Sequence, residues 1–514
     1  MFSAGCANRI GLSCLLALST CPTPGRAQGQ TNTGLATAFG LSRQVNVDAQ
    51  GNNTPGDAAN EPSLCVDPTN PQRMAVAWRQ FDHVASDFRE AGWAYTTNGG
   101  LSWTFGGVLE TNVFRSDPVL AADAEGRFYY LSLATNPDFH CDLWRSTDGG
   151  LTWQGLGAAY GGDKPWMTID TTTGPARGNI YQSWSHFEPA SNNIFTRSVD
   201  EGLTWATPQP APQVPYWGTL DVGPAGELYL VGMGDTGLWL DRCTNAWERS
   251  VPVAFDLATP INLGGTLQYS VPAINPVGLL GQLWVAADRS TGPTRGNVYV
   301  LASVSSATSG TDVMFIASTN GGVTWSPARR INDDPPNRNV WHWFGTMSVA
   351  PNGRIDACWN DTRHSSDASS SELYYSWSVD GGLAWAPNQP LSPPFQHRLG
   401  YPGQEKIGDY IGIVSLNEGA CIAYTATFNG EQDIFFVRAE LPLVASVTQG
   451  SNSVVVSWNS VPGVSYCVQY KGSLEEPWSS GDVVGCVTAT GAVTSVEDKT
   501  IGLGQRFYRV IRTL

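Results

Sequence analysis

Paired short apolar stretches recur along the chain and predict β-hairpins. Each pair consists of an apolar strand, a turn with Asp or Asn beside Pro or Gly, and a second apolar strand, as in "DPVLAADAEGRFYYLSL" and "FGTMSVAPNGRIDACW". Short strands bounded by these turn residues are the usual signature of antiparallel sheets. The hairpins begin near residues 61, 117, 164, 217, 270, 344 and 408. Regular repetition of one supersecondary unit predicts an all-β repeat architecture.

An octapeptide follows five of these hairpins. It reads "TTNGGLSW" from Thr96, "STDGGLTW" from Ser146, "SVDEGLTW" from Ser198, "STNGGVTW" from Ser318 and "SVDGGLAW" from Ser378. Its Asp or Asn can accept hydrogen bonds from turn N–H groups, its Gly can adopt a positive φ, and its Trp offers a large apolar surface. These properties indicate a structural joint, and we expect the box tryptophans to be largely buried at equivalent positions (Trp103, Trp153, Trp205, Trp325, Trp385). A degenerate copy, "LDRCTNAW", follows the fourth hairpin, and only a third strand, "DIFFVRAEL", follows the seventh.

The octapeptide resembles the Asp-box, or BNR repeat, of sialidases and other β-propellers. The resemblance implies a β-propeller over residues 43–440, with the boxes away from the functional site. "WNDTRH" and "GDYIG" resemble segments of secreted bacterial BNR-repeat proteins that are called sialidase-like. The hairpin count favours seven blades. A six-bladed ring, as in familiar sialidases, with one hairpin as an insertion is the alternative.

The last unit lacks a fourth strand, and the segment before the first hairpin can supply it. "RQVNVD", residues 43–48, alternates apolar and polar residues. Pairing of this segment with the strand around residues 434–437 would close the ring and cover an exposed sheet edge.

The two ends of the chain have different compositions. Residues 1–27 carry one Arg, a short apolar run and "GRA" before Gln28, which predicts a signal peptide and therefore export. Anchoring as a lipoprotein is the alternative. Residues 28–42 are expected to be a linker. Residues 441–514 contain "VSW", "YCVQY" and "FYRV" and resemble a fibronectin type III-like β-sandwich, in which Cys467 and Cys486 are the candidate disulfide.

Charge limits the classes of partner. The formal net charge is −16 and no basic stripe is visible, so the sequence argues against nucleic acid. The apolar run near the N-terminus is too short to span a membrane. We expect a monomer that acts on a glycan or glycoconjugate and uses no cofactor. The acidic turn "NDDPPN", residues 332–337, is an alternative Ca²⁺ site, although its ligand spacing is irregular.

Strand alternation predicts where a functional site would lie. The boxes occupy one face of the ring, so loops that enter first strands and leave second strands converge on the other face, here called the mouth. The resemblance to sialidases implies a grip on a substrate carboxylate by three arginines, which we assign to Arg79, Arg115 and Arg363. It also implies a Tyr nucleophile activated by a Glu, assigned to Tyr410 (or Tyr401) with Glu405, and an acid, assigned to Asp117 (or Asp82). Further predicted substrate contacts are Asp361, Trp217 and Trp343.

Each of these residues also has a structural interpretation. Asp361 with Arg363, and Arg115 with Asp117, can form ion pairs that hold loops. Tyr410 can pack on a neighbouring blade, and Trp217 and Trp343 can belong to the core. Two functions therefore stand side by side. One is a secreted glycosidase of the exo-α-sialidase type, and the other is a non-catalytic carbohydrate- or protein-binding scaffold at the cell surface. The motif "FRSDP", from Phe114, only approximates the Arg motif that opens sialidase domains.

Overall fold

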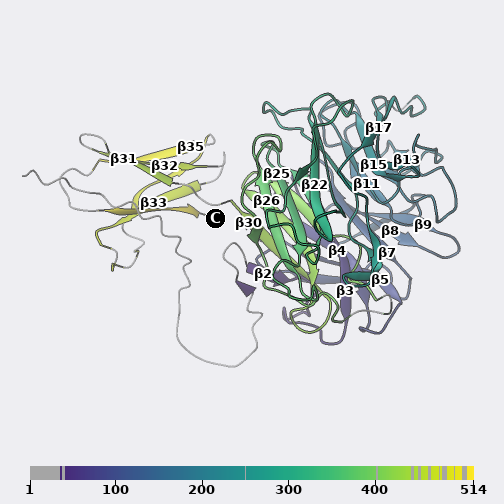
Figure 1. Cartoon of the computed structure of the whole chain (residues 1–514), viewed down its shortest axis with the longest axis horizontal. Coiled ribbons are helices and arrows are strands. Elements are labelled where there is room, and N and C mark those ends of the chain that lie inside the picture. The colour runs from purple at the N-terminus through teal and green to yellow at the C-terminus, as the bar shows by residue number, and fades with distance from the viewer. Residues whose placement is uncertain are drawn as a thin grey trace, which may run out of the picture. The chain divides into compact units, whose positions relative to one another are not determined.

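The computed structural model describes residues 35–36, 41–248, 250–400, 403, 405–441 and most of 445–513, with gaps at 450–452, 461–464, 474, 477, 479–482, 491–492 and 500–505. The predicted signal peptide and most of the predicted linker lie outside the described residues. The chain forms two compact units that meet in sequence at Glu440 and Leu441. The described residues contain strands and no helix (Figure 1).

The unit that ends at Glu440 is built from small antiparallel sheets in chain order. The first has β3 (Ala58–Val66), β4 (Met74–Phe81), β5 (Arg89–Thr96) and β6 (Thr104–Val108); the second has β7 (Ser116–Ala122), β8 (Phe128–Ala134), β9 (His140–Ser146) and β10 (Gln154–Ala158). The third has β11 (Trp166–Ile169), β12 (Ile180–Ser183) and β13 (Phe195–Ser198); the fourth has β14 (Leu220–Val222), β15 (Leu228–Gly234), β16 (Gly237–Cys243) and β17 (Leu257–Ile261).

Three further large sheets complete this unit. The fifth has β20 (Trp284–Ala287), β21 (Val298–Ser305), β22 (Thr311–Ser318) and β23 (Arg329–Arg330); the sixth has β24 (His342–Val349), β25 (Ile355–Asp361), β26 (Glu372–Ser378) and β27 (Gln389–Pro390). The seventh joins β28 (Gly412–Leu416), β29 (Gly419–Ala426) and β30 (Asp433–Glu440) to β2 (Leu41–Gln44) and β1 (Leu35–Ala36).

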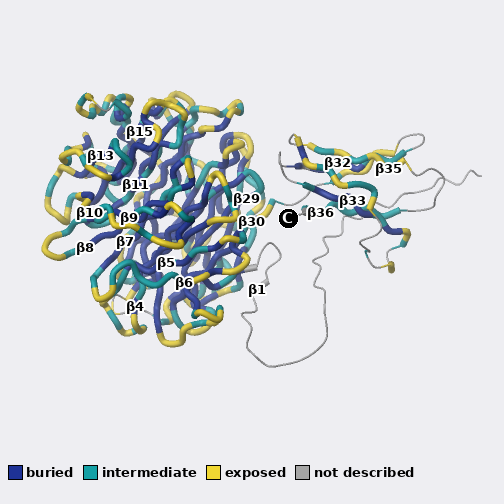
Figure 2. The backbone as a smooth tube through the Cα atoms, turned by 180° about the vertical axis from the view of Figure 1, so that it is seen from behind, coloured by how far each residue is buried: buried dark blue, intermediate teal, exposed yellow. Residues whose placement is uncertain are grey.

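The first strands of these sheets contact one another in sequence. β3 contacts β7, followed in turn by β11, β14, β20, β24 and β28, and β28 contacts β3 again. The sheets therefore stand around one centre as a closed ring. Apolar clusters fill the spaces between neighbouring sheets, and the second strands β4, β8 and β29 are almost wholly buried, as Figure 2 shows.

The N-terminal segment completes the last sheet, which confirms the predicted pairing. Arg43 pairs with Phe436, and the Val45 N–H donates to the Ile434 carbonyl at 2.8 Å. The strand itself spans Leu41–Gln44, so it begins inside the range predicted as linker and ends before residue 48. It removes the free edge that β30 would otherwise present.

The predicted fifth hairpin is wrong in its position. Residues near 270 form a separate two-stranded sheet, β18 (Tyr269–Val271) and β19 (Asn275–Leu279). The fifth sheet begins at Trp284, and its first turn is at Asp288, whose Oδ1 accepts the Ser290 N–H at 2.7 Å. Residues 279–287 are apolar except for Gly281 and Gln282, and this short interruption did not show that two different elements divide the segment.

The five octapeptides share one hydrogen-bonded turn. In the second copy, Ser146 Oγ donates to Asp148 Oδ1 at 2.7 Å, the Gly150 N–H donates to Ser146 Oγ at 2.9 Å, and the Thr152 N–H donates to Asp148 Oδ1 at 3.0 Å. Gly150 has φ of 90°. The same bonds recur at the other four copies. The boxes are structural turns.

Each box packs against the preceding sheet. A Cβ on Gly382 would lie 2.2 Å from Phe315 Cε1, and the Trp385 ring meets Phe315 edge-on at 5.2 Å. Trp103 is buried, as predicted, whereas the box tryptophans Trp153, Trp205, Trp325 and Trp385 are half-buried. The prediction that all five are largely buried is therefore too strong, because a face of each ring remains at the rim of the joint.

The unit that begins at Leu441 contains two three-stranded sheets. β31 (Ala445–Gln449), β32 (Val454–Asn459) and β35 (Val493–Asp498) form one, and β34 (Val483–Thr488), β33 (Ser465–Lys471) and β36 (Phe507–Thr513) form the other. Trp458 from β32 and Tyr466 from β33 belong to one apolar core, so the sheets face each other. The Cys467–Cys486 disulfide joins β33 to β34, which confirms the predicted pair.

Candidate functional site

In several sheets, a residue in the left-handed backbone region lies in or just before the first few positions of the first strand. The values of φ are 57° for Glu61, 46° for Asp117, 53° for Lys164, 55° for Trp217 and 59° for Phe344. Pro or Gly follows each of them in the sequence. A β-bulge accompanies Glu61, Asp117 and Phe344 in their ladders. Bulges re-aim side chains, and the kink therefore sets the side chains at the entrance of these five inner strands.

A cavity of about 540 Å³ lies at this end of the ring. Its walls carry charged side chains (Arg79, Asp87, Arg89, Asp117, Asp163, Lys164, Lys406, Asp409) and aromatic ones (Phe114, Phe139, Phe187, Trp217, Tyr269). The remaining lining residues are Ser116, Leu133, Thr135, Val277 and Leu279. All come from the first four sheets, the β18–β19 hairpin and the segment before β28. We call this space the mouth cavity.

Buried charges meet on one side of the mouth cavity. Lys164 Nζ lies 3.3 Å from Asp117 Oδ2 and 2.7 Å from Asp409 Oδ2. Lys406 Nζ also lies 2.7 Å from Asp409 Oδ2 and is 3.4 Å from Glu61 Oε1. Asp409 and Asp117 are only 1% and 2% exposed, so these ion pairs are desolvated. The β18–β19 hairpin reaches the same group, since the Leu279 N–H donates to Asp409 Oδ1 at 2.7 Å.

The carboxyl groups of this network have different pKa values. Burial alone would raise the pKa of Asp117 and of Asp409, but Lys164 and Lys406 lower both well below the usual range. Burial raises the pKa of Asp163. Burial also raises the pKa of Glu61 to about 7, against the opposing effect of Arg79. The cavity therefore combines carboxylates held in the ionised form with carboxyl groups that retain a proton more readily.

Aromatic rings also line the mouth cavity. Trp217 and Tyr269 are stacked with their centroids 5.7 Å apart, and Phe187 meets Tyr216 edge-on at 5.0 Å. Tyr269 is 52% exposed and Phe187 49% exposed. Exposed aromatic faces beside fixed polar groups are typical of a ligand pocket.

Only part of the predicted carboxylate grip lies in the mouth cavity. Arg79 lines it and is held by Glu61 Oε2, 3.1 Å from its Nε, and by Asn60 Oδ1, 2.7 Å from the same nitrogen. Arg89, which sequence reasoning missed, lines it as well, and its guanidinium lies 4.4 Å from the Phe114 ring centroid.

The other two arginines belong to separate ion-pair clusters. Arg115 contacts Glu110 and places Nη1 2.7 Å from Asp142 Oδ2. Arg363 places Nη2 2.8 Å from Asp361 Oδ2 and Nη1 2.8 Å from Asp333 Oδ1. The two arginines share no ion-pair partner among the described residues. Asp361 and Arg363 thus form the ion pair that the structural interpretation of these residues expected.

The predicted nucleophile pair is not brought together. Tyr410 is 2% exposed, its hydroxyl donates to the Pro118 carbonyl at 2.9 Å, and its ring packs edge-on against Trp166. Burial raises the pKa of Tyr410 well above its usual value. Glu405 is exposed. Tyr401 lies outside the described residues.

The remaining predicted residues divide in the same way. Trp217 and Asp117 line the mouth cavity, but a low pKa does not suit Asp117 as a proton donor. Trp343 is fully buried, and its Nε1 donates to Ser371 Oγ at 3.1 Å, so it is a core residue. Asp82 lines a different cavity.

Sequence reasoning also missed Lys406, which shares a carboxylate with Lys164. The signal was present as the short segment "KIGDY", in which a Lys precedes Asp409 by three residues in a loop entering a first strand. Phe114 and Phe187 were missed because their loops carried other polar candidates.

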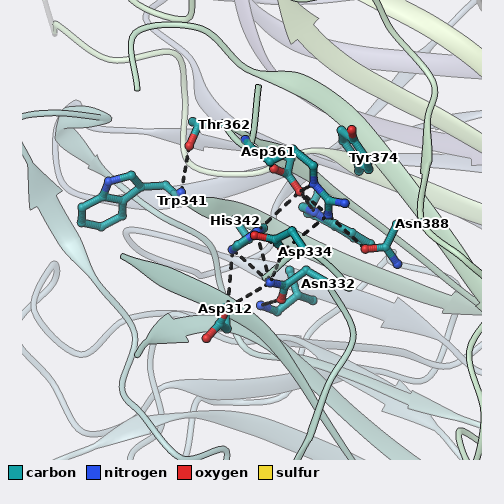
Figure 3. Close-up of polar contacts among 12 residues, drawn as sticks. Asp312, Asn332, Asp334, Trp341, His342, Asp361, Thr362, Tyr374 and Asn388 are labelled. Carbon is teal, nitrogen blue, oxygen red and sulfur yellow. Dashed lines mark hydrogen bonds and ion pairs between the residues drawn. The ribbon is translucent and has the colours of Figure 1, made fainter. Parts of the chain in front are cut away.

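The acidic turn 332–337 is part of a charge cluster around a buried histidine (Figure 3). His342 Nε2 lies 2.9 Å from Asp334 Oδ1 and 3.7 Å from Asp361 Oδ2, and Arg330 Nη2 lies 3.1 Å from Asp334 Oδ1. These carboxylates are thus occupied by protein cations. Within the described residues, no group of three or more His, Cys, Asp and Glu side chains has the arrangement of a metal centre.

Comparisons with known proteins leave the class of this chain open. No protein-family model matches it, and no curated protein matches it. The chain is similar to a solved protein of unknown function from Dyadobacter fermentans DSM 18053, with 13% identity over 80% of this chain and 100% of that chain and a TM-score of 0.45. It is also similar to Penicillium chrysogenum α-L-arabinanase complexed with arabinobiose (12% identity, 79% and 98% coverage, TM-score 0.38) and to a mutant Aleuria aurantia lectin in complex with α-methyl-L-fucoside (13%, 66% and 97%, 0.37).

At these identities and TM-scores, none of the three structures assigns a function to this chain. In the described part of the sequence, no helix has the length and apolar character to cross a membrane.

Proposed function

We propose that this protein is an exported seven-bladed Asp-box β-propeller, followed by a fibronectin type III-like module, that acts on glycans at the mouth cavity as a monomer. Each of the seven large sheets would be one blade. The observation that supports a glycan as the ligand is the combination of exposed aromatic rings and buried charges in one cavity. The apolar face of a sugar ring stacks on aromatic side chains, and its hydroxyl groups need fixed donors and acceptors.

The charge balance of the cavity favours a neutral glycan over a sialylated one. Lys164 and Lys406 have carboxylate partners, and Arg89 Nη1 lies 3.2 Å from Asp87 Oδ1. Arg79 is held by Glu61. An anionic sugar would have to displace one of these carboxylates, whereas sugar hydroxyl groups can bond to both partners of an ion pair.

Glycoside hydrolysis is the reaction that the carboxyl groups support. Asp163 has a raised pKa and suits a general acid, while Asp117 and Asp409 are held ionised and suit a base or nucleophile. Asp163 Oδ1 lies 3.8 Å and Asp409 Oδ2 lies 2.7 Å from the same atom, Lys164 Nζ, so the acid and a candidate nucleophile belong to one cluster, as glycoside hydrolysis requires.

The test is a panel of fluorogenic glycosides, neutral ones and a sialoside, together with direct binding by calorimetry. We expect turnover of a neutral glycoside that falls by at least about 100-fold in Asp163→Asn while binding is retained. Trp217→Ala should weaken binding at least tenfold. Leu203→Ala is the matched control, since it removes an exposed apolar side chain from a box turn.

The outcomes separate the two functions considered. Binding that depends on Trp217 without turnover would leave the non-catalytic carbohydrate-binding propeller, which the aromatic rings support by themselves. Preferred turnover of the sialoside would contradict the neutral-glycan assignment. Binding that is unchanged in Trp217→Ala would place the ligand elsewhere and refute the mouth cavity as the site.

A further inference from the structure

A second cavity, of about 340 Å³, lies beside the seam where the ring closes. It is lined by side chains rich in oxygen and by two aromatic residues (Asn46, Thr54, Asp57, Gln80, Phe81, Asp82, Glu90, Phe105, Gly107, Val108). Asn46 follows β2, and its Nδ2 donates to Asp433 Oδ1, at the start of β30, at 2.5 Å. The cavity therefore touches both the first and the last sheet of the ring.

Two carboxylates are buried at this seam. Asp57 is 8% exposed and Asp433 is fully buried. Gln80 Nε2 donates to Asp57 Oδ2 at 3.0 Å. Within the described residues, Asp57 Oδ1 and Asp433 Oδ2 have no hydrogen-bond partner, so each carboxylate has one oxygen satisfied by a neutral amide and one that is not. An unpartnered buried carboxylate oxygen is costly and calls for a cation or a proton.

The charged groups near this pair are acidic. Burial, together with the nearby charge of Glu431, raises the pKa of Asp57 to about 6, against the opposing effect of the Gln80 hydrogen bond. Burial raises the pKa of Asp433 to about 8, and Asp57 contributes to the rise. No described Lys, Arg or His forms an ion pair with either group. This contrasts with the mouth cavity and with the His342 cluster, where protein cations contact the carboxylates.

We propose that the ring-closure seam binds a hard divalent cation, Ca²⁺ in the first instance, through Asp57 Oδ1 and Asp433 Oδ2. Ca²⁺ accepts carboxylate, amide, hydroxyl and water oxygens in flexible geometry, which suits a site with two carboxylates beside a polar cavity. With so few charged ligands, the Kd should resemble that of extracellular calcium modules, on the order of 0.1–1 mM. The cation would join the first and last sheets and stabilise ring closure.

The test uses the purified full chain after treatment with EDTA and dialysis. Thermal unfolding is followed while CaCl₂ or MgCl₂ is added at constant ionic strength, and calorimetry measures Ca²⁺ binding directly. We expect a saturable rise in Tm with Ca²⁺, a smaller one with Mg²⁺, and one binding event. Asp57→Asn and Asp433→Asn keep the side-chain shape and should each abolish the rise. Asp138→Asn removes a charge from an exposed loop and should leave the rise unchanged.

Three results would overturn the proposal. One is a wild-type protein whose Tm and calorimetric trace do not respond to Ca²⁺, which would mean that a proton occupies the seam. Another is a rise in Tm that persists in both seam variants. The third is a rise that Asp138→Asn removes equally, which would indicate diffuse binding to the acidic surface. If one seam variant does not fold, the other variant and wild-type calorimetry decide.

Discussion

Trp103 joins the first sheet of the ring to the last, and its replacement by Ala should open that joint. The side chain is 7% exposed, and its ring meets Phe436 of β30 edge-on at a centroid distance of 5.1 Å. A Trp buries roughly 150–250 Å², which is worth about 4–6 kcal/mol at about 25 cal/mol per Å². Its Nε1 has no partner among the described residues, so no hydrogen bond is lost. We expect Trp103→Ala to lower the free energy of unfolding by about 3–5 kcal/mol.

Urea unfolding, followed by far-UV circular dichroism, measures the change. Trp153→Ala, at the half-buried equivalent position, should cost less, and Leu101→Ala, which removes a 52% exposed side chain from the same turn as Trp103, should cost under about 1 kcal/mol. Glycan binding per folded molecule should be unchanged in all three variants. A Trp103→Ala protein that keeps its stability but loses binding would mean that the box is a ligand site, and the structural interpretation would be refuted.

Two further predictions concern buried charges in the same ring. Arg354 holds Asp356 by two bonds of 2.8 Å and also donates to backbone carbonyls near β29, so Arg354→Met should cost about 3–5 kcal/mol in urea unfolding; a loss under about 1 kcal/mol would contradict this. Burial would lower the pKa of His342, but Asp334 and Asp361 raise it above its usual value. The protonated imidazole therefore stabilises the fold fully below about pH 6.5, and this stabilisation is lost as the pH rises through the folded-state pKa. Scans of Tm from pH 5 to 9 should show this fall in the wild type and a weaker one in His342→Gln; identical profiles would refute it.

The sequence predicted the parts of the fold that depend on local chemistry. The box turns need Gly with positive φ, and the hairpin turns need Asp, as at Asp123, whose Oδ1 accepts the Glu125 N–H at 3.0 Å. The pairing of the N-terminal segment followed from a missing strand. The fifth hairpin was misplaced because Pro and Gly near residue 276 looked like the turn of a blade.

The site was harder to predict. The alternation of strand direction shows on which face of the ring a loop lies, but it does not show which other residues its side chains contact. Arg115 and Arg363 occur in loops on the predicted face, yet each is held by carboxylates close in sequence or on an adjacent strand, Glu110 and Asp142 for one and Asp361 for the other. Convergence at the mouth depends on how far each loop extends, and the sequence carries no measure of this. The role predicted for Tyr410 could not be checked from the sequence for a related reason. Its hydroxyl bonds to the carbonyl of Pro118, which is 292 residues away in the chain.

The left-handed residues at the starts of the inner strands connect the fold to the site. A non-Gly residue in this region costs about 1–2 kcal/mol, and the seventh sheet shows that Gly serves there, because Gly408 has φ of 100° in the corresponding segment. At the positions of Glu61, Asp117 and Lys164 the chain has a charged residue in place of Gly, despite this conformational cost. All three belong to the buried charge network of the mouth cavity. Strain of this kind persists where the surrounding structure over-determines it, as it does at functional sites. The conformational cost of these three positions therefore supports the proposal that the mouth cavity is the functional site.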